Sequence, residues 1–247
     1  MEDKGLRKNK RYVLIWAAVL ILISLAATGC TFAKKTAEKK SEVKAAQEQK
    51  NEEPDEEEKE EEKTEEYKKG TVNGSHFESE WMNIRIDLPE SLTMASDEDI
   101  ADAVDVGKAY TTEERADLIE ETYEQGTVIY EMMAAAAPGI PNINIVVQNT
   151  GMKNITSKQL AEYAKQNLES SLEEGAAYTP VEDIHTVEIA GESYECLKAK
   201  LSANGVQINS ELYVRVKSEY SIEMTVTYTD DTAGLKDELL ASVKPYV

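Results

Sequence analysis

Four segments in the C-terminal part of the chain alternate apolar and polar residues, and this pattern most constrains the fold. The segments cover residues 187–189, 194–201, 206–216 and 220–228. Short turns separate them, and the turn at Asn204-Gly205 carries a strong signal for a hairpin. Consecutive strands that are joined by such short turns pair antiparallel. The sequence therefore predicts an antiparallel meander with one face to be covered by other elements.

Further strands are predicted upstream of this meander. Met82, Ile84, Ile86 and Leu88 alternate with polar residues, which predicts a strand over residues 77–88 that ends at Pro89. Residues 127–133 and 143–148 are apolar and rich in β-branched side chains. Pro138-Gly139 lies between these two segments and favours a turn, so we expect them to form a pair of strands.

Four helices are predicted from capping signals and apolar periodicity. Their starts are marked by Ser96, by Thr111-Thr112, by Thr156 and by Asp231-Thr232, and the first three end at Gly107, Gly126 and Gly175. The side chains expected to face inward are Ile100, Ala103, Val104, Leu118, Ile119, Tyr123, Leu160, Ala161, Ala164, Leu168, Leu172, Leu235, Leu239, Leu240 and Val243. Strands and helices together predict an α+β fold in which helices cover an antiparallel sheet.

This fold is expected to be one acidic domain over residues 71–247. The whole chain carries a net charge of −21, of which residues 1–30 contribute +3 and residues 31–70 contribute −4, so the domain carries −20. A charge of this sign and size repels nucleic acid and anionic lipid headgroups. Nucleic-acid binding is therefore excluded from the expected functions.

The N-terminal 70 residues do not have the composition of a folded domain. Basic residues precede a run of fifteen residues, 13–27, that is apolar except for Ser24 and has the length of a signal peptide. Residues 30–70 form a Lys- and Glu-rich segment, which from residue 31 contains neither Trp, Leu, Ile nor Met. Such a segment buries too little apolar surface to fold and is expected to act as a disordered tether.

The run Leu25-Ala26-Ala27-Thr28-Gly29-Cys30 resembles the end of a bacterial lipoprotein signal peptide. This resemblance implies removal of residues 1–29, attachment of diacylglycerol and fatty acids such as palmitate at Cys30, and a location on the extracytoplasmic face of the cell membrane. Two acyl chains hold a protein stably on a membrane. Because Ala27 stands where the family usually has Leu, an uncleaved signal anchor is the alternative.

The order of predicted elements resembles the PsbP-like fold, an antiparallel α/β/α sandwich. The resemblance covers roughly residues 75–245 and is carried by the following residues: Trp81, Ile84, Ile86, Leu88 and Pro89 in the early strand, 160–172 in the packing helix, 187–191 at the turn, and 239–243 in the last helix. It implies an accessory or binding module. The predicted acidic helices between Ser96 and Gly126 depart from the family pattern.

Residues with catalytic or metal-binding potential are few. Cys196 lies in a predicted strand and is expected to be structural. Asp183 and His185 are considered as an acid/base pair, and Asp99, Asp102 and Asp105 as a cation-binding helix face, but a solvated surface is the preferred interpretation of both. We therefore expect a lipid-anchored module without catalytic activity, cofactor or metal, bound to the membrane through Cys30 and engaging a protein or solute at the cell surface.

The sequence is also compatible with two other functions. The domain contains 32 acidic residues, so a cell-surface hydrolase that uses paired carboxylates is one alternative. A weak divalent-cation-binding domain is the other. Buried carboxylates that converge in one pocket would favour the hydrolase.

Overall fold

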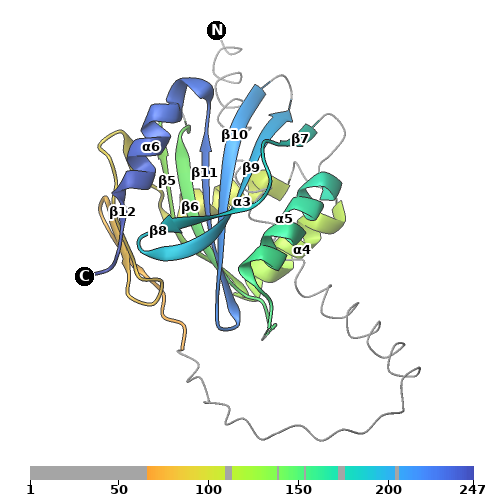
Figure 1. The fold of residues 1–247 in the computed structure, drawn as a ribbon, viewed down its shortest axis with the longest axis horizontal. Coiled ribbons are helices and arrows are strands. Elements are labelled where there is room, and N and C mark those ends of the chain that lie inside the picture. The colour runs from red at the N-terminus through yellow and green to blue at the C-terminus, as the bar shows by residue number, and fades with distance from the viewer. Residues whose placement is uncertain (1–65, 109–112, 138, 153, 172–175, 204–205) are drawn as a thin grey trace, which may run out of the picture.

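The computed structural model describes residues 66–247, except 109–112, 138, 153, 172–175 and 204–205. Two antiparallel sheets form the centre of the domain, with helices on the outside (Figure 1). The predicted α+β class is confirmed. The signal segment, Cys30 and nearly all of the tether lie outside the described residues.

The larger sheet has the strand order β4-β5-β6-β11-β10-β9-β7, with β8 also paired to β9. Its strands are β4 (Leu92–Met94), β5 (Val128–Ala136), β6 (Asn142–Asn149), β7 (Ala176–Pro180), β8 (His185–Ile189), β9 (Glu192–Ala203), β10 (Val206–Lys217) and β11 (Tyr220–Tyr228). The meander β8 to β11 and the pair β5–β6 are thus as predicted. β6 pairs with β11, and the paired residues are 71 to 85 positions apart in the chain. This pairing joins the two groups of strands into one sheet.

The smaller sheet has the order β1-β2-β3-β12 and was not predicted. Its strands are β1 (Thr71–Asn73), β2 (His76–Ser79), β3 (Ile84–Asp87) and β12 (Val243–Lys244). The prediction of one strand over residues 77–88 is wrong, because the chain turns at residues 80–83 and Asn83 adopts a φ of 58°. Trp81 and Met82 are still buried, which explains why their apolar character gave no sign of the turn.

The helices are α3 (Asp97–Lys108), α4 (Glu113–Glu124), α5 (Ser157–Ser171) and α6 (Ala233–Ser242), with a short 3-10 helix η2 (Asp230–Thr232) before α6. Two predicted caps are confirmed. The backbone N–H of Asp99 donates to Ser96 Oγ, and that of Gln159 donates to Thr156 Oγ1, each at 3.2 Å. In Figure 1, α6 lies beside the small sheet, whereas α4 and α5 lie on the opposite side of the large sheet.

Three apolar clusters form the core. The first lies between the two sheets and includes Phe77, Met132 and Leu239. The second joins α5 to β9 and β10, and the third joins α3 and α4 to β5 and Val146 of β6. The second and third clusters lie on the same face of the large sheet, above different strands.

Several details of the helix predictions need correction. Tyr123 is 39% exposed rather than inward-facing, and Val243 belongs to β12 rather than to the last helix. Thr111, Thr112, Leu172, Gly175 and the Asn204-Gly205 turn lie outside the described residues. Among the described helices none is long and apolar enough to span a membrane.

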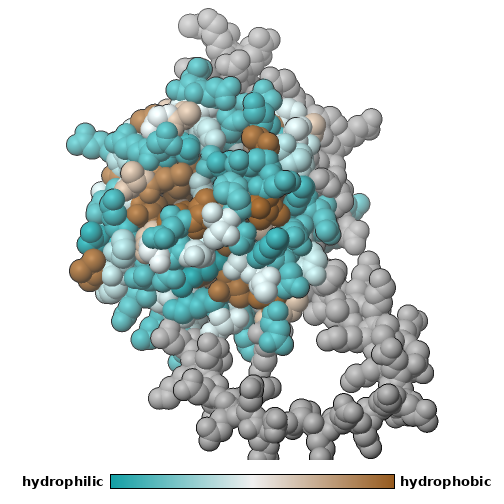
Figure 2. Space-filling view, in the orientation of Figure 1, coloured by the Kyte–Doolittle hydropathy of each residue, from teal (hydrophilic) through white to brown (hydrophobic). Residues whose placement is uncertain are grey.

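The surface shown in Figure 2 is mainly hydrophilic, with apolar residues in separate groups. Among the described residues, the exposed large apolar side chains are Val72, Tyr123, Val181, Tyr246 and Val247. They come from β1, α4, a loop and the C-terminal end. These positions do not define one apolar docking surface for a protein partner.

Candidate functional site

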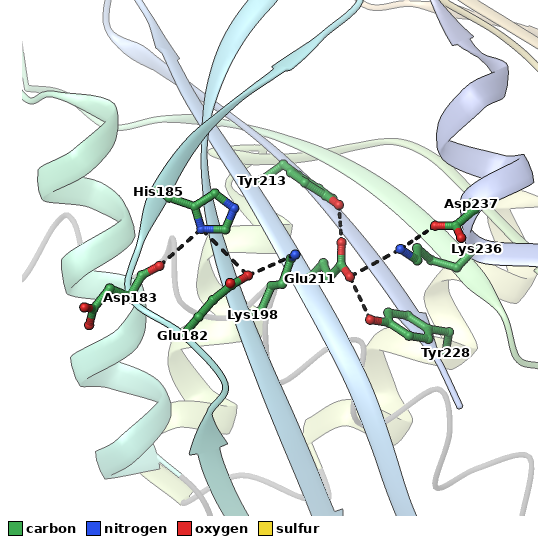
Figure 3. Close-up of polar contacts among 9 residues, drawn as sticks. All are labelled: Glu182, Asp183, His185, Lys198, Glu211, Tyr213, Tyr228, Lys236 and Asp237. Atoms are coloured by element: carbon green, nitrogen blue, oxygen red, sulfur yellow. Dashed lines mark hydrogen bonds and ion pairs between the residues drawn. The ribbon is translucent and has the colours of Figure 1, made fainter. Parts of the chain in front are cut away.

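Three groups of polar side chains are candidate sites, and the first surrounds Glu211 between the large sheet and α6 (Figure 3). Glu211 and Tyr213 are two residues apart in β10 and therefore point to the same face. The carboxylate accepts hydrogen bonds from the hydroxyls of Tyr213 and Tyr228, the latter at 2.7 Å. Lys236 of α6 places its Nζ 3.6 Å from the same carboxylate.

These contacts leave Glu211 as a satisfied acceptor. Burial, reinforced by the nearby carboxylate, raises the pKa values of Tyr213 and Tyr228, so both hydroxyls remain protonated donors. A buried carboxylate with two hydroxyl donors and a lysine fastens α6 to the sheet. It does not resemble a carboxylate poised to act as a base.

The neighbouring contacts around Glu182 follow the same pattern. Lys198 Nζ lies 2.9 Å from Glu182, and His185 Nδ1 lies 3.8 Å from it. His185 Nδ1 also lies 3.2 Å from the backbone carbonyl oxygen of Asp183, so the considered Asp183–His185 pair meets through the main chain rather than through the carboxylate. Glu182 and Glu211 each face a lysine, and these contacts provide no support for the paired-carboxylate hydrolase.

Cys196 of β9 lies opposite Tyr213 of β10 in the strand register and is fully buried. Burial raises the pKa of its thiol to about 12, so almost none of it is thiolate near neutral pH. This agrees with the structural role expected for Cys196.

The second group joins the start of the described chain to β5. Glu131 accepts hydrogen bonds from the Tyr67 hydroxyl and, at 2.8 Å, from the Gly70 backbone N–H. The Tyr67 ring stacks on Tyr220 with centroids 5.3 Å apart. Within the described residues, contacts with the sheet are thus already present at Tyr67, four residues before the domain boundary expected from the sequence.

A cavity of about 490 Å³ lies beside this contact, and Lys69, Val72, Met94, Asp97, Glu131 and Met132 are among the residues that line it. Burial raises the pKa of Glu131, whereas its hydrogen bond from Tyr67 acts in the opposite direction. Because both carboxylate oxygens already have donors, Glu131 fixes residues 67–70 to the sheet and offers little to a ligand.

The third group is a row of buried polar side chains on the helix-covered face of the large sheet, here called the polar strip. It consists of Asn142, Asn144 and Gln148 of β6, Ser221, Glu223, Thr225 and Thr227 of β11, and Ser210 of β10. Each is at most 3% exposed. The strip therefore places eight polar side chains where apolar ones would ordinarily be found.

The strand register explains how these residues come together. Asn142 pairs with Thr227, and Asn144 with Thr225, across the β6–β11 ladder. Ser210 pairs with Thr227 on the other side. The strip thus crosses the middle of the sheet between the cluster under α3 and α4 and the cluster under α5.

Many atoms of the strip lack partners. Asn142 Oδ1, both side-chain heteroatoms of Asn144 and of Gln148, Ser210 Oγ and Thr227 Oγ1 make no hydrogen bond to the described residues. A buried polar atom without a partner costs about 1–3 kcal/mol. Water or a ligand is the usual partner of such atoms in folded proteins. The polar strip is therefore our candidate functional site.

The other residues singled out from the sequence are used elsewhere. Asp99 accepts from Ser96, Asp105 forms an ion pair of 2.9 Å with Lys108, and His76 lies 2.8 Å from Asp87. The described residues contain no group of three or more His, Cys, Asp or Glu side chains that could hold a metal ion. Cys30 lies outside the described residues, so its lipidation stays a prediction.

The strip was missed by sequence reasoning, although its pattern is visible. Asn142-Ile143-Asn144-Ile145 and the residues 221–227 alternate strictly. Alternation normally indicates one solvated face, and only the positions of α3, α4 and α5 show that this polar face is buried. Amide side chains in the interior of a central strand were the one available signal, since Asn is depleted there.

No family model matches the chain, and no curated protein matches it either. Solved structures with a similar course of the backbone include cyanobacterial PsbP from Synechocystis sp. PCC 6803. Its TM-score is 0.45 and its identity 8%, and the similarity covers 72% of this chain and 95% of the PsbP chain. LpqN of Mycobacterium tuberculosis, described as involved in cell envelope biogenesis, has a TM-score of 0.39 and 11% identity. The similarity covers 65% of this chain and 82% of LpqN.

A third similar structure comes from Bacteroides thetaiotaomicron, with a TM-score of 0.35 and 13% identity. The similarity covers 71% of this chain and 50% of that one. PsbP, the family that the predicted order of elements resembles, is among these similar structures. The identities of 8–13% say nothing about function.

Proposed function

We propose that this protein is a lipid-anchored binding module on the extracytoplasmic face of the cell membrane and that the polar strip holds its ligand. The single observation that carries the binding role is the group of buried, unpartnered amide and hydroxyl atoms on β6, β10 and β11. The membrane location rests on the Cys30 pattern in the sequence.

Binding is favoured over catalysis by the chemistry of the strip. Its one titratable side chain is Glu223, which accepts a hydrogen bond of 3.0 Å from Ser221. His76 and His185, the two histidines of the chain, lie in β2 and β8 and not in the strip. A serine or threonine nucleophile needs an adjacent base, and a row of neutral amides and hydroxyls instead suits recognition.

Native mass spectrometry of the full chain tests the binding role. The protein is purified from its producing cells, and we expect a bound small molecule on the wild type. The Asn144→Leu/Thr227→Val variant should lose this mass. Asn209→Ala is the matched control, because Asn209 lies in the same sheet but bonds to Asp230 outside the strip. Equal ligand content in the variant and the wild type, or no ligand in either, would refute the proposal.

The anchor is tested by fractionating cells that produce the wild type, Cys30→Ala or Cys196→Ala. The wild type and Cys196→Ala should be found in membranes with the added mass of acyl chains, because each retains Cys30. Cys30→Ala should lack this mass and leave the membrane fraction. Retention of unmodified Cys30→Ala in membranes would indicate the signal anchor instead.

A further inference from the structure

We propose, on the basis of the function just proposed, that the ligand of the polar strip is an uncharged polyhydroxylated molecule, that is, a carbohydrate. The strip combines amide and hydroxyl groups from three adjacent strands. The following properties of the described residues distinguish this class from anions, cations and peptides.

The unpartnered atoms include both donors and acceptors. Asn144 and Gln148 each present an NH₂ group and a carbonyl oxygen, and Thr227 presents a hydroxyl. A ligand that satisfies them must donate and accept at closely spaced positions. Sugar hydroxyls do both, whereas a carboxylate only accepts and an ammonium group only donates.

The charge of the strip also disfavours ionic ligands. Its eight residues contain one carboxylate, Glu223, and no Lys or Arg. An anion would meet this carboxylate in a domain that carries −20. A calcium ion would need six to eight oxygen ligands and more than one carboxylate to offset its charge. Hydroxyl groups can donate to Glu223 without adding charge.

The position of the strip argues against an added peptide strand. Peptides that extend a sheet bind to an exposed edge. β6 is already paired with β5 and β11, and β11 is paired with β6 and β10, so neither strand has a free edge. A ligand of the strip has to be recognised by side chains across the face of the sheet.

An aromatic ring borders the strip, which is covered by helices. Tyr130 pairs with Val146 in the β5–β6 register, and Val146 pairs with Glu223, so a ring lies beside the strip. Aromatic rings bind the apolar faces of ligands with a low cost in side-chain entropy. α4 contacts β5, whereas α5 contacts β7, β9 and β10. A ligand would therefore enter between α3 and α4, which pack on β5 and Val146 of β6, and α5, which packs on β9 and β10.

Isothermal titration calorimetry tests the ligand class on the full chain in a detergent without a sugar headgroup. The probes are maltotriose and chitotriose, with glutamate, inorganic phosphate and a neutral tripeptide as competitors of other classes. We expect saturable heat with at least one saccharide and none with the other probes. Asn144→Leu and Thr227→Val should each weaken saccharide binding at least tenfold, and Asn209→Ala should leave it unchanged.

Other outcomes separate this inference from the proposed function. Strip-dependent binding of glutamate, phosphate or the tripeptide but of no saccharide would refute the carbohydrate assignment and leave the binding role intact. Saccharide binding that the strip variants do not weaken would refute the assignment of the site. If no probe binds and a crystal structure shows only ordered water at the strip, both the inference and the proposed function fail.

Discussion

Asn142 of β6 lies directly opposite Thr227 of β11, where these two inner strands of the large sheet pair, and both side chains are fully buried. Asn142 Oδ1 and Thr227 Oγ1 nevertheless make no hydrogen bond to the described residues. The Asn142 amide nitrogen does donate, at 2.9 Å, to the Gly139 carbonyl oxygen. The pair thus combines a fixed orientation with open hydrogen-bonding positions, which is the arrangement expected of a prepared binding site.

Thr227→Val is expected to maintain or increase the stability of the ligand-free protein. It removes a buried hydroxyl without a described partner, and the gain should not exceed about 1–3 kcal/mol. Urea unfolding measures the change. Thr186→Val is the matched control, because Thr186 is exposed and bonds to Glu195, and it should change stability by no more than about 0.5 kcal/mol. A loss of more than about 1 kcal/mol in Thr227→Val would mean that the hydroxyl supports the fold.

Glu211→Ala is expected to destabilise the protein by about 3–5 kcal/mol, because it leaves Lys236 and two tyrosine hydroxyls without their buried partner. A double-mutant cycle with Tyr228→Phe should give a coupling energy of about 0.5–3 kcal/mol. Pairing Tyr228→Phe with Glu90→Ala, at an exposed position outside the Glu211 contacts, should be additive. Additivity of the Glu211 pair would show that their hydrogen bond contributes nothing.

The stability of the protein should depend on pH through Glu131. Burial raises its pKa in the folded state, so the folded protein binds this proton more tightly than the unfolded chain does. The stability that proton binding by Glu131 contributes is fully present below the pKa of Glu131 in the unfolded chain. It disappears as the pH rises through the pKa of Glu131 in the folded protein. Urea midpoints measured between about pH 4 and 8 should therefore fall less in Glu131→Gln than in the wild type. Parallel profiles of Glu131→Gln and the wild type would contradict the raised pKa. Glu90→Gln is the control, because Glu90 is exposed, and its profile should follow the wild type.

Cys196 should resist thiol reagents in the folded protein. In Cys30→Ala it is the one remaining thiol of the chain, and its pKa of about 12 leaves roughly one thiolate in ten thousand at pH 8. Labelling with a chromogenic disulfide should therefore be slow in buffer and rapid in unfolding concentrations of urea. Fast labelling without urea would place the thiol at an accessible surface.

The local elements followed from local signals. The caps at Ser96 and Thr156 and the alternation from residue 187 to 228 predicted α3, α5 and the strands β8 to β11, because capping and hairpin turns depend on neighbouring residues. The turn at residues 80–83 was missed because Trp81 and Met82 are buried despite lying in it. β1, β4, β7 and β12 were missed because strands of two to five residues have too few positions to show a period, whereas the equally short β8 was recognised beside the turn that leads into β9.

The sequence by itself determined the α+β class, the meander, two helix caps, the acidic charge and the expectation of a lipid anchor at Cys30. These properties depend on composition or on residues close together in the chain. Only the tertiary structure decided that β6 pairs with β11, that Glu131 binds the chain at Tyr67 and Gly70, and that the polar strip is buried. The physical reason is that an alternating strand shows which residues share a face, whereas solvent exposure of that face depends on packing by distant helices.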